Sequence, residues 1–100
     1  MAQTDDRRGG GLMARVPAIA APLRRRRVER RLRGFILDEL VERPFHGEDP
    51  LAAGAVDSLG QERLATFIGE VYGLELSDDD MVAENFKDIR TLAAYVEARR

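Results

Sequence analysis

Three stretches of this chain repeat their apolar residues at the spacing of an α-helix, which constrains the fold more than any other feature. Residues three and four positions apart share one helix face, so each stretch forms an apolar stripe. The three sets are Val28, Leu32, Phe35, Ile36 and Leu40; Leu64, Phe67, Ile68 and Val71; and Ile89, Leu92, Ala93 and Val96. No segment alternates with the period of two that a half-buried strand needs. We therefore expect an all-α protein.

The breaks between these stripes set the expected domain organisation. Pro44 ends the first pattern, and Gly73 follows the second at the usual position of a helix C-cap. We place helices at about 22–41, 58–72, 81–85 and 88–99. The expected architecture is an up-and-down-like four-helix bundle with a short third helix, within a domain spanning residues 22–100. Residues 1–21, with three consecutive glycines and an Ala-rich piece, predict a flexible N-terminal extension.

Composition excludes several classes of functional site. The chain has no cysteine, so it can form no disulfide, no thiolate metal site and no thiol nucleophile of its own. His46 is the sole histidine and has no cluster of ligands around it in the sequence, so we interpret it as a solvated loop residue rather than a metal ligand or triad member. The acidic run at 78–80 lacks the glycine and the final glutamate of a calcium loop.

Hydropathy and targeting signals point to a cytoplasmic protein without a membrane partner. No apolar stretch is long enough to cross a bilayer. Two arginines near the start resemble an export signal, but the apolar stretch after them is too short and is interrupted by Arg15. We therefore expect neither export nor membrane attachment.

The small net charge of -2 hides a strong asymmetry along the chain. Residues 1–43 carry eleven arginines against six acidic residues, a balance of +5, whereas residues 44–100 carry five basic against twelve acidic residues, a balance of -7. The cluster Arg24–Arg33 could bind nucleic acid, an anionic membrane or an acidic partner enzyme. Because it lacks interleaved aromatics and a nucleic-acid-binding motif, we favour a solvated helix face.

A long connection at 44–57 separates the first two helices. It contains two prolines and two glycines, yet also the apolar residues Phe45, Leu51 and Val56, which we expect to pack onto the helices. A connection of this length in so small a domain is usually functional or tied to the core.

The tripeptide Asp57-Ser58-Leu59 opens the second predicted helix and is the principal candidate site. Ser58 and Gln61 fit a capping box, in which the serine hydroxyl only accepts a hydrogen bond from the backbone. Asp57 is itself a capable cap, however, which leaves the Ser58 hydroxyl beside the unsatisfied N–H groups that favour a phosphate. Leu59 could have a purely structural role, in which its side chain packs into the core.

From about residue 24 to residue 98 the chain resembles the acyl carrier and peptidyl carrier proteins. The resemblance rests on the motif at 54–59, on the helix at 64–72 followed by Gly-Leu-Glu-Leu, and on residues 85–92 leading into the last helix. It implies a four-helix bundle with no catalytic machinery, and hence that the protein is not an enzyme.

The resemblance also implies a covalent cofactor and a set of partners. Ser58 would carry 4′-phosphopantetheine taken from coenzyme A, and Asp57 and Leu59 would help a phosphopantetheinyl transferase recognise the site. The cofactor thiol would hold acyl or aminoacyl groups as thioesters for an acyl- or aminoacyl-activating ligase and for condensing or acyl-transfer enzymes. The pathway would make a fatty acid, polyketide or other natural product. The second helix would be the docking surface, with Gly60 among its outward positions.

One alternative reading of function stays open on the sequence. The chain could be a small helical interaction module whose basic first helix binds nucleic acid or an acidic partner, although nucleic acid is the less favoured ligand. Modification of Ser58 would distinguish the two.

Overall fold

The computed structural model describes residues 20–100, and within them the structure is helical with no strand. Helix α2 spans Ala20–Phe35 and continues directly into a π-helical segment, η1, at Ile36–Leu40. Helix α3 spans Ser58–Tyr72, and helix α4 spans Ile89–Arg99. The all-α prediction is confirmed for this part of the chain. The N-terminal extension predicted at 1–21 lies outside the described residues, apart from its last two positions, which belong to α2.

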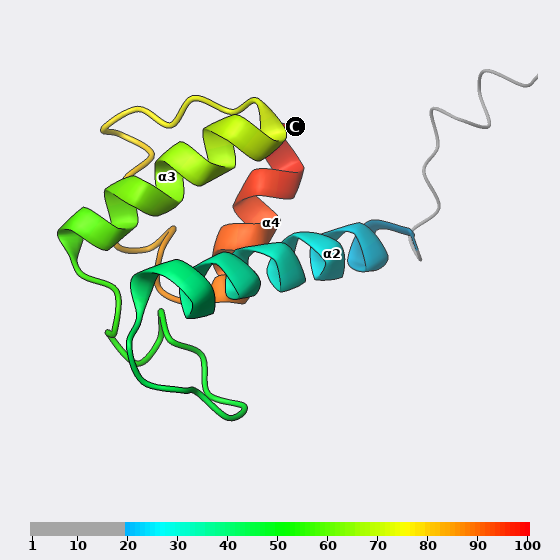
Figure 1. The fold of residues 1–100 in the computed structure, drawn as a ribbon. Coiled ribbons are helices and arrows are strands. Elements are labelled where there is room, and N and C mark those ends of the chain that lie inside the picture. The colour runs from blue at the N-terminus through cyan, green and yellow to red at the C-terminus, as the bar shows by residue number, and fades with distance from the viewer. Residues whose placement is uncertain (1–19) are drawn as a thin grey trace, which may run out of the picture.

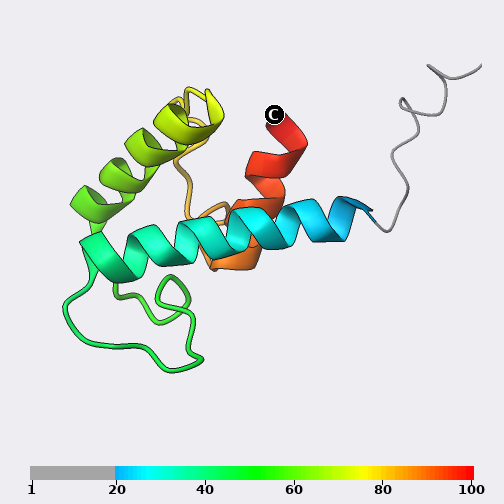
Figure 2. The same cartoon turned by 45° about the vertical axis from the view of Figure 1, so that its right-hand side comes forward.

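The three helices surround one core: α4 packs across α2, and α3 lies on the side of α2 to which the C-terminal end of α4 extends (Figures 1 and 2). Side chains from all three apolar stripes are buried at their centre, as the spacing predicted. The fully buried members are Val28, Leu32, Ile36, Leu64, Ile68, Leu92, Ala93 and Val96. Phe35 and Phe67 stack at the edge of this core with ring centroids 4.3 Å apart. The connection between η1 and α3 extends from the side of α2 opposite α3 (Figure 1).

The first helix reaches the predicted end near Val41 but changes type over its last five residues. The Val41 N–H donates to the carbonyl oxygen of Ile36 at 3.2 Å, which is the five-residue spacing of a π-helix. Leu40, the last residue of η1, and Val41, whose backbone is extended, both pack against the core, while Asp38 and Glu39 stay exposed.

The short third helix predicted at 81–85 is wrong, so the bundle has three helices among the described residues rather than four. The segment forms turns instead, in which Asn85 N–H donates to Val82 O and Phe86 N–H donates to Ala83 O. A helix of one turn fixes many backbone angles for one hydrogen bond, so it needs tertiary support to form. Here the Asn85 side chain bonds to the backbone oxygen of Asp80 at 2.9 Å and holds the turns in place.

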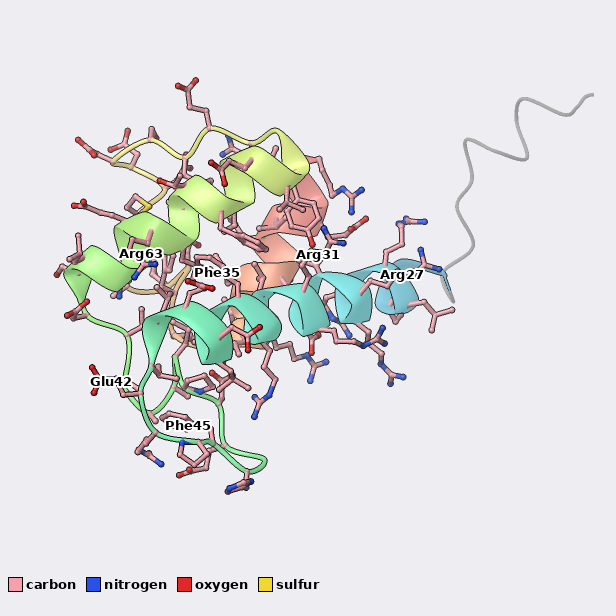
Figure 3. The ribbon with its side chains drawn as sticks, viewed as in Figure 1. Arg27, Arg31, Phe35, Glu42, Phe45 and Arg63 are labelled. Carbon is pink, nitrogen blue, oxygen red and sulfur yellow. The ribbon has the colours of Figure 1, made fainter. Side chains whose placement is uncertain are left out.

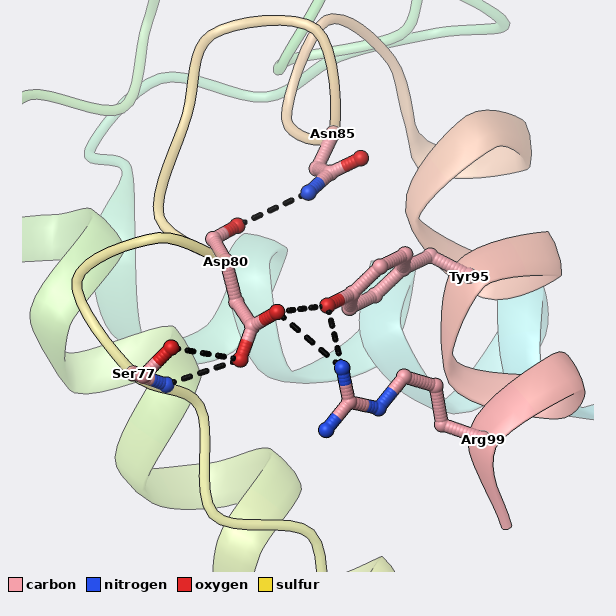
Figure 4. A network of polar contacts seen from close by, with 5 residues as sticks. All are labelled: Ser77, Asp80, Asn85, Tyr95 and Arg99. Atoms are coloured by element: carbon pink, nitrogen blue, oxygen red, sulfur yellow. Dashed lines mark hydrogen bonds and ion pairs between the residues drawn. The ribbon is translucent and has the colours of Figure 1, made fainter.

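The turns are tied to α4 through the carboxylate of Asp80 (Figure 4). It accepts hydrogen bonds from the Tyr95 hydroxyl and from the Ser77 backbone and hydroxyl, and it pairs with Arg99 at 3.0 Å. The Tyr95 bond, followed by the Ser77 bonds and the Arg99 charge, lowers the pKa of Asp80 to about 2. Asp80, the last residue of the acidic run at 78–80, therefore has a structural role.

Replacing Leu64 with alanine should destabilise the fold by about 2–5 kcal/mol, because a fully buried leucine leaves a cavity when truncated. Leu59→Ala on the same helix is the matched control, since Leu59 is 66% exposed and its truncation should cost less than about 0.5 kcal/mol. Urea unfolding followed by circular dichroism measures both changes. Equal destabilisation by the two variants would contradict the core described above.

The Asp80 anchor should make stability depend on acidic pH. The folded pKa lies below the ordinary value of 3.8, so the stabilisation is complete above that value and is lost as the pH falls towards 2. Asp80→Asn should therefore lower the urea midpoint at pH 6 and have a diminishing effect between pH 4 and pH 2. Asp79→Asn, at an exposed neighbour, is the control and should change the midpoint little at any pH. A constant difference between wild type and Asp80→Asn over this range would contradict the assignment.

Candidate functional site

The connection between η1 and α3 is held against the core, which fixes where α3 begins. Phe45, Leu51 and Val56 are buried, at 6%, 7% and 7% exposure, so their predicted packing is confirmed. Asp49 organises the backbone between them. Its Oδ1 accepts hydrogen bonds from the N–H groups of Leu51 and Ala52, at 2.9 and 3.1 Å.

The second carboxylate oxygen of Asp49 joins the connection to α4. Oδ2 accepts a hydrogen bond from the backbone N–H of Ile89, the first residue of α4, at 2.9 Å. Sequence reasoning missed this residue as an anchor. The turn itself could have been predicted, because Asp followed by proline is a common turn-forming pair, and the Asp side chain in such a turn bonds to N–H groups further along the chain. The partner at Ile89 is 40 residues away and had no signal in the sequence.

Helix α3 is capped by Asp57 and not by Ser58. Asp57 has an extended backbone (φ -81°, ψ -175°), and its Oδ1 accepts from the Gly60 N–H at 2.8 Å. Its carbonyl oxygen accepts from the Gln61 N–H, also at 2.8 Å. The capping-box interpretation of Ser58 is therefore wrong, and the view of Asp57 as the cap is confirmed.

Ser58 is exposed at the first position of α3. Among residues 20–100 its hydroxyl makes no hydrogen bond, and the backbone N–H groups of Ser58 and Leu59 have no acceptor. These N–H groups lie at the positive end of the helix dipole, where an anion is stabilised. The chain thus presents a free hydroxyl next to two free donors.

The exposure of Leu59 and of Gly60 is the opposite of what the sequence predicted. Leu59, considered as a possible core contact, is 66% exposed, whereas Gly60, expected on the outward face, is buried. A Cβ at Gly60 would lie 2.8 Å from Val56 Cγ1 and 3.3 Å from Asp57 Oδ1. The connection therefore crosses the first turn of α3 so closely that only glycine fits, and this contact turns Leu59 outward.

The remaining candidate residues form no second site. His46 is exposed, as expected of a loop histidine. In the part of the chain that the structure describes, no three histidine, cysteine or acidic side chains are grouped so as to hold a metal ion. No helix within the same residues is long and apolar enough to cross a membrane.

Comparison with known proteins leaves the geometry as the principal guide. A scan against protein-family models and searches of the curated proteins and of the solved structures each found no match.

Gly60→Ala should destabilise the fold by about 1–3 kcal/mol, because the new methyl group meets the stiff side chain of Val56 and the capping oxygen of Asp57. Gly34→Ala is the matched control. A Cβ at Gly34 meets no atom within 4 Å, so alanine should stabilise α2 by up to about 1 kcal/mol through helix propensity. Urea unfolding measures the change in the free energy of unfolding for each variant, and the two changes should have opposite signs. A stabilising effect at Gly60 would mean that the connection does not contact α3 there.

Proposed function

We propose that this protein is a carrier that holds acyl or aminoacyl groups as thioesters on 4′-phosphopantetheine attached to Ser58. The observation that carries the proposal is the exposed, unbonded hydroxyl of Ser58 at the start of α3, where Asp57 has taken over the capping role. A serine freed from capping at a helix N-terminus is available for modification. The resemblance of the sequence around it to carrier proteins supports the same function.

The residues at this position suit a phosphodiester. The N–H groups of Ser58 and Leu59 are without acceptors among the described residues and can donate to phosphate oxygens, and the helix dipole favours the negative charge. Asp57 keeps these donors ordered by capping the third N–H, that of Gly60. That bond occupies Oδ1 of its carboxylate. The cofactor, once bound, supplies the thiol that the cysteine-free chain lacks.

In the modification, the Ser58 oxygen forms a bond to the phosphorus that bears the pantetheine arm of coenzyme A. The bond from that phosphorus to the bridging oxygen of the pyrophosphate breaks, the adenosine bisphosphate half leaves, and the hydroxyl proton passes to a base of the transferase. The described residues of this chain supply the nucleophile and its surroundings, and the transferase supplies the catalysis. In this proposal the protein itself is not an enzyme.

The surface around Ser58 suits transient docking of a transferase and of enzymes that load and unload the thiol. Leu59 offers an apolar contact beside the attachment point. Arg63 is directed away from this surface towards η1, where it donates to the Glu39 carbonyl at 3.2 Å and lies 3.7 Å from the Glu39 carboxylate (Figure 3). Glu62 and Glu70 of α3 are exposed and form no ion pair with any other described residue, so acidic side chains dominate the charge of its outer face.

Incubation with coenzyme A, Mg²⁺ and a broad-specificity phosphopantetheinyl transferase, followed by intact-mass measurement, tests the proposal. Wild type should gain the mass of one phosphopantetheine, and Ser58→Ala should gain none. The chain has only two serines, so Ser77→Ala is the matched control and should be modified as fully as wild type. Because Ser58 is exposed and unbonded, its truncation should change stability by less than about 0.5 kcal/mol.

The proposal fails if several competent transferases leave wild type unmodified while modifying a known carrier in the same reaction. It fails equally if Ser58→Ala is modified to the same extent as wild type. A loss of modification shared by Ser58→Ala and Ser77→Ala would place the reacting group elsewhere.

A further inference from the structure

An open hollow of about 310 Å³ lies between helix α2 and the first turn of α4, and Ser58 is not among the residues that line it. Four arginines line it, and they come from two elements. Arg26, Arg30 and Arg33 follow one face of α2, and Arg90 is the second residue of α4, next to Asp49 and Ile89. Side-chain nitrogens gather along this helix in Figure 3. Since α2 and α4 pack on each other, the four guanidinium groups are held on a common scaffold.

The negative charges beside the hollow are already engaged by other groups. Glu29 accepts a hydrogen bond from Arg25 at 3.4 Å, and both oxygens of Asp49 accept hydrogen bonds from backbone N–H groups. Within residues 20–100, none of the four lining arginines forms an ion pair. By contrast, Arg24 pairs with Glu97 at 2.9 Å and Arg99 pairs with Asp80. The four arginines outnumber the two carboxylates in the lining, Glu29 and Asp49, so the hollow carries a net positive charge.

The kind of ligand follows from the donors. A guanidinium group presents a planar fork that matches two phosphate oxygens, so arginines from two directions can hold linked phosphates from both sides. The Ile89 N–H is occupied by Asp49, which leaves side chains rather than the helix end to bind an anion. No aromatic side chain lines the hollow, so it offers no platform on which a nucleic-acid base could stack.

We propose that this hollow binds a small anion containing at least two linked phosphate groups. A second hollow, of about 330 Å³ and lined by Arg27, Arg30 and Arg31, adjoins it through Arg30 and extends the positive field that attracts such an anion. The site is separate from the proposed carrier function, so Ser58→Ala should bind the anion as wild type does.

Sodium tripolyphosphate is the probe, titrated into the full chain at constant ionic strength and followed by calorimetry. The double variant Arg30→Gln/Arg90→Gln removes one donor from each element and should weaken binding by about tenfold or more, since each lost bond is charge-assisted. Arg43→Gln/Arg63→Gln removes the same net charge from exposed arginines outside the hollow and should change the affinity by less than about twofold.

Amide chemical-shift mapping of wild type gives a second measurement that needs no variant. Tripolyphosphate should shift the signals of Arg30, Arg33, Ile89 and Arg90 at concentrations where sulfate does not. Equal weakening in the two double variants would overturn the proposal in favour of a diffuse basic surface. Shifts spread over the whole chain, or no difference between tripolyphosphate and sulfate, would overturn it as well. Tighter binding of a single-stranded oligonucleotide than of tripolyphosphate would assign the surface to nucleic acid instead.

Discussion

The carboxylate of Asp49 is the link on which the arrangement of this small protein depends. One oxygen closes the turn at Leu51 and Ala52, and the other accepts the first N–H of α4. A long connection without regular structure is thereby attached to the helix that packs across α2. From that anchor the chain is carried past Val56 to Asp57, and so to the exposed start of α3. The position of Ser58 is thus set by a residue nine positions before it.

The parts of the fold that the sequence predicts are those governed by repeating local patterns. Leu64, Phe67 and Ile68 lie on one face only in a helix, because residues three apart point to opposite faces of a strand. Leu64 and Ile68 are fully buried in that helix. Gly73 has the left-handed backbone (φ 70°) that the C-cap of α3 requires. The exposed hydroxyl of Ser58 could also be predicted locally. Asp57 and Ser58 are adjacent and both can cap α3, and Asp57 is the residue that does so.

The parts that could not be predicted depend on contacts between distant residues. The π-helical end of the first helix is one such part, because Leu40 and Val41 pack there against a core built from residues far along the chain. The turns at 81–85 replace a helix because Asp80 is held by Tyr95 and Arg99, which lie on α4. Gly60 differs in that its contact, Val56, is only four residues away, but the path of the connection that brings the two together depends on the distant bond from Ile89 to Asp49. In each case packing decided a feature that local propensity does not specify.

The division of charge along the chain persists in space. Side-chain nitrogens lie mainly along α2, while side-chain oxygens gather over α3 and the connection that follows it (Figure 3). A molecule built in this way has a dipole moment, and a dipole is turned by the field of an approaching partner before any atoms touch. An anion and a positively charged protein surface would therefore meet opposite sides of the same molecule. Salt would weaken both encounters, because it screens the field that turns the molecule.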